Sequence, residues 1–362
     1  MKKVITMMSL ALMGMVSVGA LSSCSQDDEP GTAQSVSSNA ISFNVTTDNA
    51  AGTRGVPTTA ANYLTQVKDF KVWGTLANGG NYYLGRTGDA GILIANKGGG
   101  KWDYNVATDV VYWPNNEAMN FYAITPSSNS NYTFNGGLLT YTVPTDNSKQ
   151  IDLMVAKAAN QTKTTNKGVV NLPFEHALSQ VVFKGMTKSS NLSVEIQSIT
   201  IHNVNSVMTL GLNGTATTPA AQYANYSLGM GGTKTVAVTD ASKAVNLTAA
   251  DGALMLVPQT LTGWADKTST KAADAAHQAY IEIVCKITSK TSAGVTYLVG
   301  TATAYDKTCV PLPATWQAGK RYVYTLQFGG GKDPNTGADR FAPITFTMHV
   351  SDWADSSSNI AL

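Results

Sequence analysis

The chain has 362 residues, with 25 basic and 23 acidic side chains and only 13% charged residues. A balance this close to neutral disfavours nucleic acid as a partner, because neutralising phosphates requires a basic surface. The chain is rich in Gly, Thr, Ser and Asn, a composition that favours strands and turns.

The first 23 residues have the pattern of an export signal. Lys2 and Lys3 precede an uncharged apolar run over 4–20, and small residues lead to Cys24. This arrangement is typical of a secretory signal, and the cysteine after the cut resembles the lipobox of a bacterial lipoprotein. The run is too short to span a bilayer. We therefore predict a signal peptide over 1–23 and acylation of Cys24; the alternative is an ordinary signal peptide with a chance cysteine.

A tether and a short strand follow the predicted lipid site. Removal of the signal peptide takes away Lys2 and Lys3 and leaves 23 basic and 23 acidic side chains. Residues 25–40 are mostly small and polar, with an acidic triplet at 27–29. The triplet resembles a surface-export signal, and the alternative is a solvated linker. Residues 41–45 alternate apolar and polar, which predicts a strand. Arg54 and Gly55 lie in a loop of the kind that proteases cut.

The rest of the chain reads as many short strands separated by turns, without a convincing helix beyond one or two turns at 58–66. This pattern predicts an all-β fold of sandwich type, and the length predicts two domains with a boundary near 171–173. The expected strands are 67–76, 82–85, 110–114, 119–124, 138–143, 151–156, 178–184, 192–202, 207–212, 253–257, 278–287, 295–304, 321–328 and 344–350.

No catalytic or metal-binding pattern is visible. The four histidines form no spaced metal motif, and Gly-x-Ser-x-Gly is absent. A glycosidase would need two carboxylates from distant parts of the chain, and nothing indicates such a pair. We predict no enzyme activity, no cofactor and no metal. Cys285 and Cys309 form a disulfide or remain as two buried thiols, and the sequence leaves both possibilities open.

Aromatic residues are concentrated in the first half of the chain. Exposed, they could stack on sugars; alternating along strands, they would more simply fill a core. They are Trp73, Tyr82, Tyr83, Trp102, Tyr104, Tyr112, Trp113 and Tyr122.

Several short blocks lie in order along nearly the whole chain. They are Tyr112–Pro114 with Met119–Ala123, Asp152–Ala156 with Leu172–Val181, Leu254–Gln259, Leu312–Pro313 with Trp316–Tyr324, and Ile344–Trp353. Each block is modest, but the ordered set is fairly specific. Together the blocks resemble the fimbrillin family, the subunits of lipoprotein-derived (type V) pili.

The resemblance implies two transthyretin-like β-sandwich domains in tandem, here 55–172 and 173–362. It also implies an N-terminal strand (41–47) that fills a groove of the first domain in the precursor and leaves with residues 24–54 after a trypsin-like protease cuts at Arg54. A C-terminal strand of another subunit (343–362) would then enter the groove. The side chains concerned are Ile41, Phe43 and Val45 in the plug and Ile344, Phe346, Met348 and Val350 in the donor.

The sequence therefore predicts a structural pilus subunit that supports adhesion. Its expected partners are other pilus subunits, the processing protease and, through the lipid of the precursor, the outer membrane. It would start as an outer-membrane lipoprotein and end in a cell-surface pilus. The alternative is a surface glycan-binding lipoprotein, which would share the lipid, the tether and an aromatic-rich sandwich. Stalk, tip and anchor roles are not distinguished.

Overall fold

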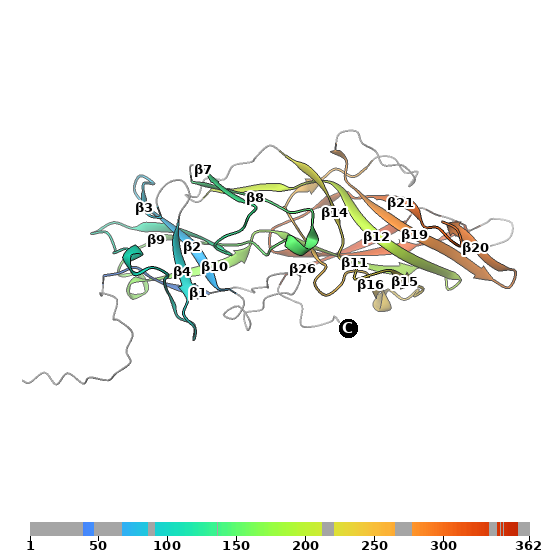
Figure 1. The fold of residues 1–362 in the computed structure, drawn as a ribbon, viewed down its shortest axis with the longest axis horizontal. Coiled ribbons are helices and arrows are strands. Elements are labelled where there is room, and N and C mark those ends of the chain that lie inside the picture. Colours follow the sequence, from blue (N-terminus) through green and yellow to red (C-terminus); the bar gives the residue numbers. More distant parts are fainter. Residues whose placement is uncertain are drawn as a thin grey trace, which may run out of the picture. The chain divides into compact units, whose positions relative to one another are not determined.

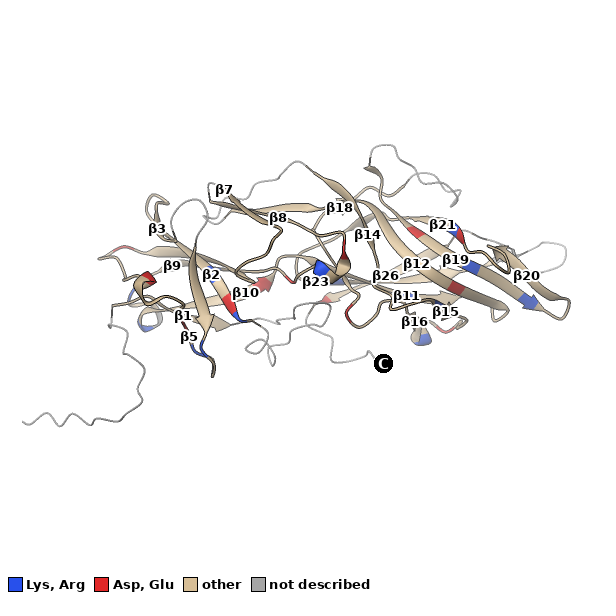
Figure 2. Cartoon of the chain, in the orientation of Figure 1, with Lys and Arg blue, Asp and Glu red and all other residues tan. Residues whose placement is uncertain are grey.

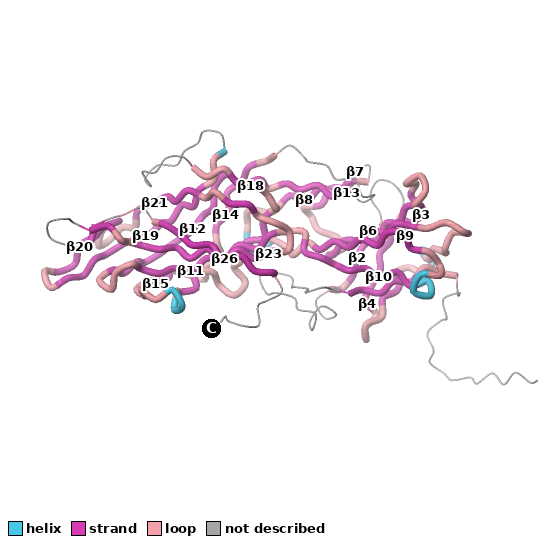
Figure 3. Tube along the Cα trace, turned by 180° about the vertical axis from the view of Figure 1, so that it is seen from behind, coloured by secondary structure: helices cyan, strands magenta, loops and turns pink. Residues whose placement is uncertain are grey.

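The structure is a computed structural model. It describes residues 39–46, 67–85, 91–135, 137–211, 221–264, 277–332, 339–340, 342 and 344–353. The predicted all-β class is confirmed: the part of the chain described here consists of strands, four short 3-10 helices and connecting turns (Figures 1 and 3). No helix in it has the length and apolar character needed to cross a membrane.

The first half of the chain supplies an eight-stranded sheet in the order β1-β10-β9-β6-β2-β4-β5, with β3 paired to β2. Its strands are β1 (Ser42–Thr46), β2 (Asp69–Leu76), β3 (Tyr82–Leu84), β4 (Ile92–Asn96), β5 (Trp102–Tyr104), β6 (Met119–Thr125), β9 (Met154–Gln161) and β10 (Val169–His176). The turn predicted at Asn78–Gly80 connects β2 to β3, and Gly79 and Gly80 supply the positive φ angles (101° and 66°) that such a turn needs.

Two further sheets, of five and six strands, share one hydrophobic cluster, which makes them the two layers of a sandwich. The five-stranded sheet contains β16 (Val245–Asn246), β11 (Ser179–Thr187), β23 (Lys320–Phe328), β26 (Thr345–Asp352) and β17 (Leu254–Leu256). The six-stranded sheet contains β14 (Tyr223–Ser227), β12 (Leu192–Asn205), β19 (Tyr280–Thr291), β20 (Gly294–Val299), β15 (Lys234–Val236) and β21 (Asp306–Pro311).

Smaller sheets and 3-10 helices complete the described fold. They are β7 (Tyr132–Asn135), β8 (Leu138–Thr142) and β13 (Val207–Gly211), the pair β18 (Thr260–Leu261) and β22 (Ala314–Thr315), the pair β24 (Gly331–Lys332) and β25 (Asp339–Arg340), and the helices η1 (Ala107–Asp109), η2 (Asn147–Lys149), η3 (Thr165–Gly168) and η4 (Ala241–Lys243).

The buried apolar side chains form two large clusters. Each strand contributes alternate residues to a cluster, because successive side chains point to opposite faces of the sheet. The first lies within the eight-stranded sheet and includes Phe43, Phe70, Phe121 and Phe174. The second lies between the five- and six-stranded sheets and also takes in side chains from β2, β6 and β8. Charged residues are sparse and dispersed over the strands (Figure 2).

Local expectations differ from the structure at several places. The strand expected over 110–114 is wrong, because only an isolated bridge from Tyr112 to Ala40 forms there. Near the predicted domain boundary, β10 runs through Pro173 to His176. Proline is tolerated there because the ladder with β1 ends opposite Pro173 and the ladder with β9 begins at Phe174. The strands expected over 278–287 and 295–304 form a hairpin with a short turn, in which Thr291 lies opposite Gly294. The predicted division into two domains stays a prediction.

Candidate functional site: the N-terminal strand and its groove

The strand β1 lies at the edge of the eight-stranded sheet and pairs in parallel with β10. Its register runs from Ser42 opposite Val169 to Thr46 opposite Pro173. Ile41 is fully buried and Phe43 is 6% exposed, whereas Asn44 is exposed and Val45 is half-buried. The alternation seen in the sequence therefore corresponds to one face in the core and one toward solvent.

Phe43 is surrounded by aromatic rings from three other strands of the sheet. Its ring centroid lies 6.1 Å from Phe70, 6.1 Å from Tyr104 and 5.9 Å from Phe121, each in an edge-to-face arrangement. Edge-to-face pairs contribute about 0.5–1.5 kcal/mol beyond the area they bury. Phe43 is thus the main side-chain anchor of β1.

The residues just before β1 are bonded to another part of the chain, on the side away from β10. Ile41 N donates to Val111 O at 2.9 Å, and Trp113 N donates to Asn39 O at 3.0 Å. Tyr104 Oη, on β5, donates to Ile41 O at 2.9 Å. Burial raises the pKa of Tyr104, which keeps its hydroxyl protonated as a donor. Because β1 and β5 are the two ends of the strand order, the sheet curls until its ends meet at β1.

We call the position between β10 and the segment around Val111 the β1 groove. Without β1, the groove would expose an apolar trough and unpaired backbone groups on both sides, which is the geometry that binds an added strand. Arg54, Gly55 and Cys24 lie outside the described residues, so the processing and lipid sites stay predictions.

The predicted donor residues lie at and just before β26, the last strand of the five-stranded sheet. β26 pairs antiparallel with β23, and Ile344 is 3% exposed. Phe346 is half-buried, while Met348 and Val350 are 43% and 42% exposed. Of these four side chains only Ile344 is fully buried, and the strand itself pairs within the chain's own sheet.

A buried polar pair lies at the end of β10, where β10 pairs with β9. His176 Nδ1 is 2.8 Å from Asp152 Oδ1, and both side chains are almost completely buried. The imidazole stacks on Trp353, just after β26, with ring centroids 4.2 Å apart. Burial raises the pKa of Asp152, and His176 opposes that shift. Asp152, His176 and Trp353 all fall in the blocks that carry the family resemblance, but their spacing in the sequence gives no sign that they meet.

The disulfide alternative for Cys285 and Cys309 is wrong, because both are free, buried thiols. Cys309 lies opposite Glu282, three residues from Cys285 along β19. An odd separation places the two sulfurs on opposite faces of the sheet, and the residues accordingly belong to different hydrophobic clusters. Burial raises the pKa of Cys285 to about 12 and that of Cys309 to about 11.

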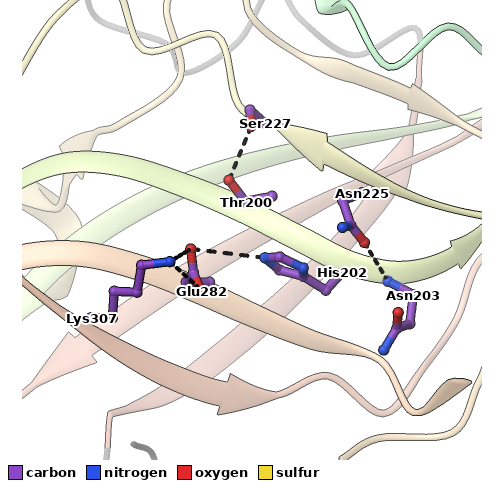
Figure 4. A network of polar contacts seen from close by, with 7 residues as sticks. All are labelled: Thr200, His202, Asn203, Asn225, Ser227, Glu282 and Lys307. Carbon is purple, nitrogen blue, oxygen red and sulfur yellow. Dashed lines mark hydrogen bonds and ion pairs between the residues drawn. The ribbon is translucent and has the colours of Figure 1, made fainter. Parts of the chain in front are cut away.

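A network of polar contacts lies on the outer face of the six-stranded sheet (Figure 4). Lys307 Nζ contacts both carboxylate oxygens of Glu282 at 3.1 Å, and His202 Nε2 lies 4.0 Å from the same carboxylate. Burial lowers the pKa of His202. The imidazole of His202 also stacks on the ring of Tyr280. These contacts join β12, β19 and β21 across the sheet. No group of three or more potential metal ligands occurs in the described residues.

Of the eight aromatic residues singled out in the first half, four are core residues, two are half-buried and two are exposed. Trp73, Trp102, Tyr104 and Trp113 are at most 8% exposed, whereas Tyr83 and Tyr112 are 40% and 47% exposed. The pair of exposed tyrosines is joined by a hydrogen bond from Tyr83 Oη to Tyr112 O at 3.0 Å. The aromatic concentration therefore mainly reflects packing.

An all-β protein with a short N-terminal strand at the edge of its first sheet is the class that this architecture defines. The profile of the fimbrillin-like family matches residues 53–353, and the chain belongs to that family. No curated protein matches the sequence.

Comparison with solved structures finds matches among fimbrial and adhesion proteins, and one of them shows a similar fold. A fimbrial protein from Bacteroides vulgatus superposes with a TM-score of 0.56 at 19% identity, covering 87% of this chain and 99% of that one. A putative cell adhesion protein from Bacteroides uniformis gives 0.44 at 15% identity, covering 88% and 100%. A tip fimbrial protein from Porphyromonas gingivalis gives 0.40 at 12% identity, covering 87% and 100%.

Proposed function

We propose that this chain is a structural pilus subunit that is exported as a lipoprotein acylated at Cys24 and matured by cleavage after Arg54. Cleavage disconnects β1 from β2, so that β1 leaves with residues 24–54 and the lipid. A strand of another pilus subunit then enters the β1 groove. The finished subunit is a part of a cell-surface pilus that supports adhesion.

The observation that carries the proposal is the position of β1. It is a five-residue strand at a sheet edge, and in sequence the predicted cut site lies between it and β2. If β1 leaves, its side-chain contacts in the core and its backbone hydrogen bonds to β10 are lost together. Burying Ile41 and Phe43 contributes about 1.5–3 kcal/mol each, so β1 binds well enough to plug the groove yet is small enough to be replaced.

Replacement by a strand of equivalent shape restores these contacts. Such an exchange is head-to-tail and does not close on itself, so repeated exchange generates a filament. The plug would also prevent the precursor from polymerising before it is processed. Membership of the fimbrillin-like family supports this assignment over a glycan-binding lipoprotein.

Processing at Arg54 is tested with limiting trypsin and intact-mass measurement. The wild-type precursor should be cut first after Arg54, and Arg54→Ala should abolish that product. Lys97→Ala is the matched control, since Lys97 is an exposed basic residue in a turn and its loss should leave the first cut unchanged. A first cut elsewhere in the wild type would refute the assignment of Arg54.

A further inference from the structure

The C-terminal strand β26 is fixed at both of its ends. We infer that β26 stays in the sheet of its own subunit, and that Trp353, stacked on the buried His176–Asp152 pair, locks it there. The lock itself is a property of the single subunit. Its consequence rests on the proposed strand exchange: β26 is not the strand that this subunit gives to a neighbour.

The ladder between β26 and β23 spans the whole strand. Eight register pairs run from Lys320 opposite Asp352 to Gln327 opposite Thr345. An ion pair between Lys320 and Asp352 closes one end, and the Lys188 ammonium donates to the Thr345 hydroxyl at 3.0 Å near the other. A departing β26 would give up this entire ladder.

Part of the apolar face of β26 already has partners. Register places Phe346, Met348 and Val350 opposite Leu326, Tyr324 and Tyr322, and all three of those β23 residues are at most 2% exposed. Phe346 packs edge-to-face on Tyr324 at 5.2 Å, whereas Met348 and Val350 are 43% and 42% exposed. Packing within the subunit therefore holds the start of β26, and the backbone ladder holds the rest.

Trp353 ties β26 to a second sheet. Its backbone N donates to Gly319 O at 3.1 Å, and its indole is 1% exposed and stacked on His176 of β10. His176 is in turn held by Asp152, just before β9. Withdrawing β26 would uncover a buried, hydrogen-bonded polar pair and expose the indole of Trp353, and both changes are unfavourable.

The lock also contacts the chain that connects β10 to β11. Ala177 N donates to Leu153 O, just before β9, and Gly319 N donates to Leu178 O. Because Trp353 N donates to Gly319 O, the fixed end of β26 is bonded to the junction between β10 and β11.

A cross-link tests whether β26 has to leave. Thr325 and Thr347 are directly opposite each other, a spacing that a disulfide can span. In a Thr325→Cys, Thr347→Cys variant cut after Arg54, oxidised and reduced protein should assemble equally. Assembly of the reduced form alone would overturn the inference. If the oxidised variant, the reduced variant and the cut wild type all fail to assemble, the strand-exchange proposal is refuted. Amide hydrogen exchange then decides whether Trp353 locks β26.

Amide hydrogen exchange in the uncut precursor tests the lock directly. Trp353→Ala should speed exchange of the β26 amides about tenfold or more, because local opening becomes easier. Met348→Ala, in the exposed part of the same strand, is the control and should change it little. Trp353→Phe keeps an aromatic ring that can stack on His176 and should preserve slow exchange of the β26 amides. His176→Gln removes the imidazole on which Trp353 stacks and should speed that exchange. Unchanged exchange of the β26 amides in both Trp353→Ala and His176→Gln would overturn the lock. If Trp353→Ala does not fold, the result for His176→Gln decides.

Discussion

Replacing Phe43 with alanine removes the side chain that holds β1 in its groove. Phe43 is 6% exposed and is packed against three aromatic rings. A Phe→Ala change in a core costs about 3–5 kcal/mol. Because β1 is short and lies at an edge, we expect the lower end, about 3 kcal/mol, which corresponds to roughly a hundredfold larger population with β1 undocked.

The assay is denaturant unfolding of the precursor before and after cleavage at Arg54. Phe43→Ala should destabilise the uncut precursor by about 3 kcal/mol and have no effect on cleaved protein from which β1 has dissociated. Asn44→Ala is the control: its side chain is exposed and makes one hydrogen bond, to Asn171 at 3.1 Å, so its loss should cost at most about 1 kcal/mol. A change below about 1 kcal/mol for Phe43→Ala would refute the view that this ring anchors β1.

Two further outcomes follow from the same geometry. Tyr104→Phe removes the bond from Tyr104 Oη to Ile41 O and should destabilise the precursor by about 0.5–1.5 kcal/mol without altering the cleaved product; an equal loss in both forms would mean that the hydroxyl does not act through β1. In a Cys24→Ser background, Cys285 and Cys309 should not react with a thiol reagent at pH 8 in the folded protein and should both react after unfolding, because burial raises their pKa values to about 12 and about 11. Rapid labelling of the folded protein would contradict their placement.

The strand content and the all-β class were predictable because alternation has a period of two wherever one face of a strand is buried. β1 is the clearest case: Ile41 and Phe43 read as one face in the sequence and lie on one face in the fold. The same rule could not say where β26 belongs. An alternating strand fits its own sheet and a neighbour's groove equally well, and only the register with β23 distinguishes them.

The remaining features depend on contacts between distant residues, which spacing does not encode. Tyr104 and Val111 bond Ile41, just before β1, because the sheet curls, and Asp152, His176 and Trp353 meet across two sheets. The disulfide alternative failed for a similar reason. Two cysteines on neighbouring strands are compatible with a bond until the register places their sulfurs on opposite faces.

The central claim is that β1 is a removable plug, and the mass and oligomeric state of the precursor after limiting trypsin test it most directly. The account predicts a single cut after Arg54, separation of the fragment that carries β1, and growth of ladders or filaments from the remaining chain. A fragment that stays bound, or a cut product that loses the fragment and stays monomeric at concentrations where pili would form, would contradict it.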